Sequence, residues 1–164
     1  MSRTPWPVRV WKMHCAHLYL NACGGWAKRE RPIIILEAVS AAGARVEKVN
    51  LAKKFEKIPE YWKPYIAAEL NGQHVKLDRL KGEFVWHRHE KEDEMFWVVK
   101  GRFRMDLRED PIWLEEGEFL VVPRGVEHRP VADEEAWVVL FEPASTVNTG
   151  NVESARTLRK LDHI

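Results

Sequence analysis

Residues 82 to 101 read GEFVWHRHEKEDEMFWVVKG, and residues 117 to 132 read GEFLVVPRGVEHRPVA. In the first stretch a single residue separates His87 from His89. Side chains alternate between the two faces of a strand, so these two imidazoles are expected on the same face. Glu94 follows at the start of the next apolar segment, where its carboxylate can reach the same point.

The second stretch supplies a third imidazole after a tight turn. Pro123 fixes the backbone φ angle, and Gly125 lets the turn close before His128. Three neutral imidazoles and one carboxylate form a standard ligand set for a divalent transition metal. The sequence therefore predicts a mononuclear metal site made of His87, His89, Glu94 and His128.

The identity of the metal stays open at this stage. Copper, iron, manganese, nickel and zinc all accept these ligands, and copper or iron is favoured if the site carries redox chemistry. A copper site could use the three histidines alone, without Glu94. Asp93 is the alternative carboxylate ligand, although Glu94 fits the strand that follows better.

The chain around these stretches is typical of an all-β protein. Asn71-Gly72 is a strong hairpin signal between two segments of strand character. Short strands at even spacing, separated by tight turns, indicate a sandwich or barrel. The expected strands are 66–70, 73–80, 83–89, 95–99, 102–107, 112–114, 118–122, 127–131 and 136–141, with a turn at 133–135.

Both ends of the chain differ from this pattern. In residues 1–45 the apolar residues show no sustained helical or strand periodicity. We interpret this segment as a poorly structured extension, or as residues upstream of the true start of the gene product. Asn50 can cap a short helix whose apolar side chains include Phe55, and Pro59 ends it. Residues 46–147 would form the barrel, and residues 148–164 a tail that wraps it.

The two stretches together resemble the paired motifs of the cupin superfamily. In the first motif the spacer between Gly82 and His87 is one residue shorter than in the family pattern, and in the second Ala132 replaces a terminal asparagine. The resemblance covers roughly residues 47 to 146 and is closest to single-domain bacterial cupins called mannose-6-phosphate-isomerase-like. It implies a jelly-roll β-barrel with a short N-terminal helix, and metal binding by His87, His89, Glu94 and His128.

The resemblance also implies a homodimer, because cupins commonly pair. Trp86, Trp97 and Trp113 fall near strand ends or on the strand phase opposite to the ligands. Large aromatic side chains clustered on a surface are expected to be covered, so these residues are predicted in a second sheet layer or a dimer interface. An aromatic platform for sugar rings is the alternative.

Composition excludes several classes of protein. The formal net charge of +1 gives no overall electrostatic case for binding nucleic acid or an anionic membrane. No apolar run approaches the length needed to span a bilayer. The two cysteines do not make a disulfide framework, which favours a cytoplasmic location and leaves secretion open.

Two functions from different classes are compatible with such a site. The first is a metal-dependent oxidoreductase that uses oxygen or peroxide to oxidise or cleave a small organic or saccharide substrate, including copper-dependent carbohydrate oxidation. The second is a non-redox sugar isomerase or lyase, or a non-catalytic cupin that binds a sugar or another small ligand. Tyr65 and Gln73 are expected at the mouth of the substrate pocket. No partner acid or base stands out beside the ligands, although Lys76, Glu83, Tyr65 and Glu142 could all be placed inward.

Overall fold

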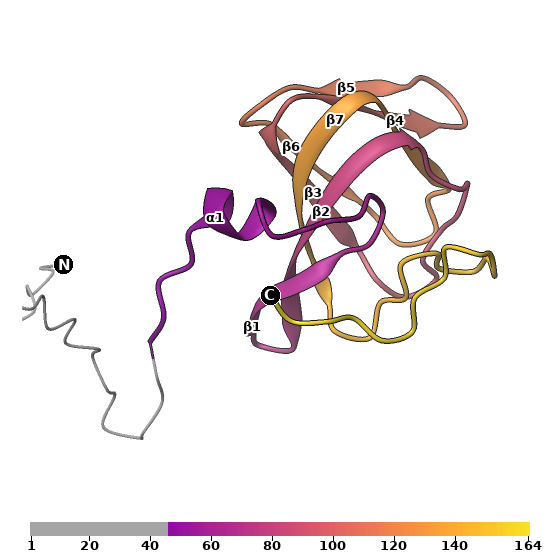
Figure 1. Ribbon diagram of the computed structural model, residues 1–164. Coiled ribbons are helices and arrows are strands. Elements are labelled where there is room, and N and C mark those ends of the chain that lie inside the picture. Colours follow the sequence, from indigo (N-terminus) through magenta and orange to yellow (C-terminus); the bar gives the residue numbers. More distant parts are fainter. Residues whose placement is uncertain (1–45) are drawn as a thin grey trace, which may run out of the picture. The chain divides into compact units, whose positions relative to one another are not determined.

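The computed structural model describes residues 46–164, and within this range almost all regular structure is antiparallel β-sheet (Figure 1). The predicted all-β fold with one short N-terminal helix is confirmed. The predicted N-terminal extension, residues 1–45, lies outside the described residues. The elements are α1 (Leu51–Phe55), β1 (Tyr65–Leu70), β2 (Gln73–Glu83), β3 (Glu94–Lys100), β4 (Phe103–Leu107), β5 (Ile112–Leu114), β6 (Phe119–Val122) and β7 (His128–Pro143).

Strand β7 organises the barrel. The strands are ordered β1-β2-β7-β3-β6, and β4 pairs with both β5 and β7. The first residues of β7 pair with β4, and its later residues pair with β2 on one side and β3 on the other. In Figure 1 this strand curves along the barrel. Because β2, β3 and β4 all pair with it, these strands surround the same interior.

Two stretches of the chain differ from the sequence prediction by more than the ends of a strand. The expected turn at 133–135 is part of β7, because the residues on both sides of it find strand partners. The expected strand at 83–89 is absent as a regular strand. Instead β2 continues to Glu83 through an irregularity between Leu80 and Gly82, where Gly82 adopts a φ of 78°.

Two apolar clusters stabilise the barrel. The larger fills the interior and includes Phe96, Phe103 and Val138, all of them buried. The smaller lies under α1, where the ring of Phe55 stacks on Trp137 with centroids 5.0 Å apart. Asn50 begins the helix as predicted, because its side-chain oxygen accepts the backbone N–H of Lys53 at 3.1 Å.

The C-terminal segment, residues 148–164, lies against the barrel at two places. Ile164 donates its backbone N–H to Ile66 of β1, and Ile66 donates to Asp162, at 3.0 and 2.9 Å. Further back, Asn151 donates its backbone N–H to the carbonyl of Arg88, which lies between His87 and His89. Among residues 46–164, no helix is long and apolar enough to cross a membrane.

Candidate metal centre

The structure brings together the four side chains that the sequence singled out. Each of His87, His89, Glu94 and His128 offers one ligand atom, and these atoms all lie within 4.8 Å of one another. All four residues are buried, with exposed fractions of 4% or less. Four such donors within this distance form a cluster that can hold a metal ion.

Backbone hydrogen bonds position the ligands. Glu94 is the first residue of β3 and His128 the first of β7, whereas His87 and His89 come from the irregular segment that follows β2. That segment is held to the chain opposite it, because the backbone N–H groups of His87 and His128 donate to each other's carbonyls at 3.1 and 2.9 Å. Gly125, in the turn before β7, donates to the carbonyl of His89 at 2.7 Å.

The alternative carboxylate ligand, Asp93, lies outside the cluster and binds a backbone N–H group. It is exposed, and its Oδ1 accepts the backbone N–H of Arg124 at 2.9 Å. Asp93 therefore closes the Pro123–Gly125 turn from outside, while Glu94 points inward.

Two of the histidines have their tautomer set by carbonyl groups. The Nδ1 of His87 lies 3.0 Å from the carbonyl of Val85, and the Nδ1 of His128 lies 3.0 Å from that of Val126. A carbonyl can only accept, so each Nδ1 donates to it, and Nε2 is the ring nitrogen left for the cluster. Outer hydrogen bonds of this kind orient metal-binding histidines.

Three of the atoms that face the centre of the cluster have no hydrogen-bond partner among the described residues. Oε2 of Glu94 lies 3.2 Å from Nε2 of His89 and 3.5 Å from Nε2 of His128. All three atoms are buried and lack a hydrogen-bond partner. Buried polar atoms without partners are costly, and a metal ion would satisfy all of them at once.

The electrostatics of the cluster also suit a metal. Burial, helped by the neighbouring His128, lowers the pKa of His87 to about 4, so this imidazole is neutral at pH 7. Burial acts to raise the pKa of Glu94, but His128 and His89 outweigh it and hold that pKa below its ordinary value. A neutral imidazole and an ionised carboxylate are the protonation states that coordination requires.

A cavity opens beside the cluster in the interior of the barrel. His87 and Glu94 form part of its wall, and apolar side chains form most of the rest. Two further carboxyl groups reach it, those of Asp78 and Glu142. The apolar lining residues include Trp62, Leu80, Phe84, Phe96 and Leu140.

These two carboxyl groups correct the expectation that no acid or base stands beside the ligands. Burial raises the pKa of Asp78 well above its ordinary value, and burial together with Glu94 raises that of Glu142 to about 8. Nζ of Lys76 lies 2.7 Å from Oε1 of Glu142, and both side chains are fully buried. Lys76 and Glu142 were among the residues that could be placed inward, whereas Asp78 was missed because it alternates along β2 like a residue of a solvated face.

The two predicted pocket residues lie elsewhere. Tyr65 packs with the smaller apolar cluster beneath α1, and the ammonium group of Lys63 lies over its ring at 5.3 Å. Gln73 begins β2 directly after the Asn71-Gly72 turn and pairs with Leu70. Neither residue lines the cavity beside the cluster.

Comparisons with known proteins agree with the fold and with the motifs. A family model described as a cupin domain matches residues 74–142. A solved cupin-2 domain containing protein from Shewanella frigidimarina is 41% identical, and the match covers 58% of this chain and 93% of that chain with a TM-score of 0.57. The uncharacterized protein YdbB of Bacillus subtilis is 30% identical over 81 residues, which are 49% of this chain and 72% of that protein.

A third relative has an enzymatic name. Acireductone dioxygenase 1 of Coprinopsis cinerea is 39% identical over 67 residues, which are 37% of this chain and 37% of that protein. The match to the cupin model and the high coverage of the Shewanella protein show the family. This chain belongs to the cupin superfamily.

Proposed function

We propose that the chain binds one divalent transition metal through His87, His89, Glu94 and His128, and that it is a small oxidoreductase. The observation that carries this proposal is the convergence of imidazole nitrogens and a carboxylate oxygen that are buried and unpartnered among the described residues. Its substrate would be a small organic molecule or saccharide that enters the cavity beside the cluster.

The ligand set favours iron over copper. A buried carboxylate next to imidazoles is typical of non-haem iron sites, whereas copper would be satisfied by the three histidines alone. Iron held here would supply oxidation of an organic substrate with dioxygen or peroxide. The dioxygenase name of the Coprinopsis relative supports this assignment over the matched segment.

The remaining residues of the cavity would control water and protons. The apolar wall formed by Leu80, Phe96 and Leu140 keeps water away from the ligands. Glu142, whose pKa lies near 8, can hold a proton close to the cluster at neutral pH. Lys76 fixes the orientation of that carboxyl group, because its Nζ donates to Oε1 of Glu142 at 2.7 Å.

Glu142 also supports a second candidate, a non-redox sugar isomerase or lyase of the mannose-6-phosphate-isomerase-like type. Such an enzyme needs a group that takes and returns a proton beside the metal, and pKa values near the working pH suit this role. Zinc or manganese, held by the same residues, would then polarise the substrate.

Reconstitution separates the two candidates. Metal-free protein would be loaded in separate samples with iron(II), copper(II), manganese(II) and zinc(II), and incubated with phenols, diketones and sugars while oxygen or peroxide consumption is followed. We expect substrate-dependent consumption with iron or copper and none with zinc. Conversion of a sugar by the zinc or manganese form, without consumption of an oxidant, would overturn the oxidoreductase in favour of the second candidate.

A further inference from the structure

A second hollow adjoins the metal-site cavity. It lies between residues 60–63 and the C-terminal segment, and is lined by Glu60, Tyr61, Trp62, Lys63, Arg156 and Leu158. Trp62 also lines the inner cavity beside His87 and Glu94. A molecule in this outer cleft is thus one side chain away from the inner cavity.

Arg156 is held at this boundary by three contacts. Its guanidinium carbon lies 5.6 Å from the ring centroids of both Trp62 and Phe84, and these two rings stack on each other at 5.1 Å. Its Nη1 donates to the backbone carbonyl of Glu83 at 2.6 Å. The guanidinium is therefore oriented, although the residue is exposed.

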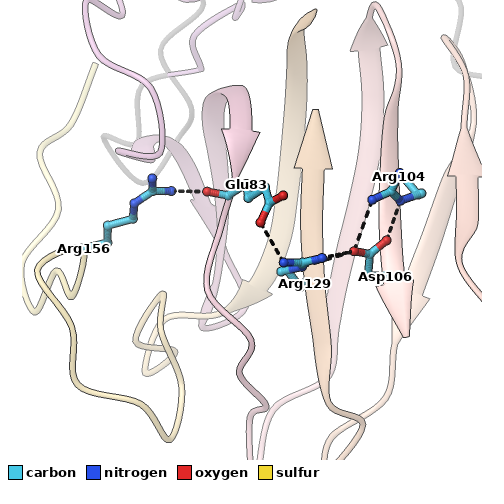
Figure 2. Close-up of polar contacts among 5 residues, drawn as sticks. All are labelled: Glu83, Arg104, Asp106, Arg129 and Arg156. Carbon is cyan, nitrogen blue, oxygen red and sulfur yellow. Dashed lines mark hydrogen bonds and ion pairs between the residues drawn. The ribbon is translucent and has the colours of Figure 1, made fainter. Parts of the chain in front are cut away.

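The charge of Arg156 is not balanced by the network around it. Figure 2 shows that the Glu83 carboxylate turns away from Arg156 and accepts from Arg129, at 2.7 Å. Arg129 also binds Asp106, and Arg104 binds the same carboxylate. Arg104 and Arg129 thus share the carboxylates of Glu83 and Asp106, whereas the hydrogen bond of the Arg156 guanidinium goes to a neutral carbonyl.

The other cation in the cleft is already paired. Nζ of Lys63 lies 3.2 Å from Glu60 and 3.9 Å from Asp162. On the same segment as Arg156, Arg159 pairs with Glu153 at 2.6 Å. Among the described residues that line the cleft, Arg156 is therefore the cation that forms no ion pair and has N–H donors left for a ligand.

The backbone and side chain of Trp62, which lies between the two hollows, are held in one conformation by their neighbours. Trp62 has a φ of 61°, a conformation that is unfavourable for a bulky side chain. Its backbone N–H donates to Arg79 at 3.0 Å, and its indole N–H donates to Lys81 at 2.7 Å. Strain of this kind persists only where neighbouring groups impose it, and it concentrates at functional sites.

We propose that Arg156 recognises the carboxylate of a small organic acid, and that the substrate of the site belongs to this class. The guanidinium offers planar pairs of donors that match a carboxylate, and among the described residues only its Nη1 has a hydrogen-bond acceptor. The assignment of this ligand as substrate rests on the proposed function, because it requires the adjoining cavity to be the reaction site.

Direct binding tests this assignment on the full chain. Pyruvate and benzoate would be titrated calorimetrically into metal-free and zinc-loaded protein, beside their uncharged amides and phenyl phosphate. We expect the carboxylates to bind both forms, and the amides to bind at least about tenfold more weakly. Arg156→Gln should weaken carboxylate binding about tenfold, while Arg159→Gln should leave it unchanged.

Three results would overturn the inference: equal binding of acids and amides, tighter binding of phenyl phosphate than of benzoate, or equal losses in the two variants. Melting temperatures and metal contents of both variants show whether a loss reflects unfolding. If Arg156→Gln melts early, Arg156→Lys, which keeps the charge, provides the second comparison, and it should retain more carboxylate binding than Arg156→Gln. If the unmodified protein binds metal but no carboxylate, this inference alone is rejected. If the unmodified protein binds carboxylates but no metal, the proposed function alone is rejected.

Discussion

His87 and His128 lie opposite each other, joined by a pair of reciprocal backbone hydrogen bonds, with their ring centroids 4.3 Å apart. Their spacing is therefore set by the backbone and not by packing of the two rings. Because His128 begins β7, this bridge ties the irregular segment that carries His87 to the strand that pairs with β2, β3 and β4.

Gly150 is expected to be essential for the position of His89. Its φ is 51°, and a Cβ added there would overlap the carbonyl of Arg88 and lie 3.2 Å from Nδ1 of His89. Gly150→Ala should lower both the melting temperature and the metal affinity. Gly72→Ala is the matched control, because Gly72 also has a positive φ but its Cβ would meet nothing within 4 Å.

The control should lose only about 1–2 kcal/mol, the cost of a left-handed conformation for alanine. Thermal unfolding and a metal titration of the two variants make the comparison. Equal effects of the two substitutions would show that the C-terminal segment does not support His89.

The buried contact between Lys76 and Glu142 predicts strong coupling between the two residues. Removing Lys76 leaves the Glu142 carboxyl group buried without its hydrogen-bond partner, so Lys76→Met should lower the free energy of unfolding by about 1–3 kcal/mol. Adding Glu142→Leu removes that buried polar group and should restore much of the loss. Urea unfolding of the single and double variants measures the coupling, and additive losses would contradict it.

Glu135 gives the folded state a dependence on pH. Its carboxylate accepts from Arg79 at 2.6 Å, from Tyr61 at 2.8 Å and from Trp137 at 2.7 Å. Arg79 is the main cause that lowers the pKa of Glu135 to about 2. Since the folded pKa lies below the ordinary value of 4.5, the stabilisation is complete above pH 4.5 and is lost as the pH falls towards 2.

Glu135→Gln should therefore destabilise the protein by about 1–2 kcal/mol at pH 7, allowing for the partial exposure of the group. At pH 3 the difference from the unmodified protein should be clearly smaller. Urea unfolding at the two pH values measures both differences, with Glu134→Gln, at the exposed neighbour, as control. If the difference in the free energy of unfolding were the same at pH 3 as at pH 7, the charge of Glu135 would not be what stabilises the folded protein.

The spacing of the two motifs singled out the four residues of the cluster, and the Pro123–Gly125 turn brings the chain to His128. Strand alternation does not explain how His87 and His89 meet, because they follow β2 in an irregular segment that backbone bonds to His128 and Gly125 hold. Asn50 and Asn71-Gly72 correctly predicted the helix start and the first hairpin. These features depend on a few neighbouring residues and do not require the tertiary structure.

What the sequence missed depends on pairing across the barrel. The continuity of β7 through residues 133–135 arises from its partners on other strands. Asp78 looks solvated by its polarity but is buried beside the cavity, and Tyr65 contributes to the cluster under α1. No local pattern shows which face of β1 or β2 is covered.

The metal content of untagged protein, purified without added metal and compared with its ligand variants, tests the central claim most directly. We predict about one equivalent of a transition metal per chain, iron above copper, and loss of that metal in His87→Ala, His89→Ala and His128→Ala. Glu94→Gln should weaken iron binding more than copper binding, since the carboxylate is the ligand that favours iron. Metal that stays bound in all three histidine variants would contradict the assignment of the site.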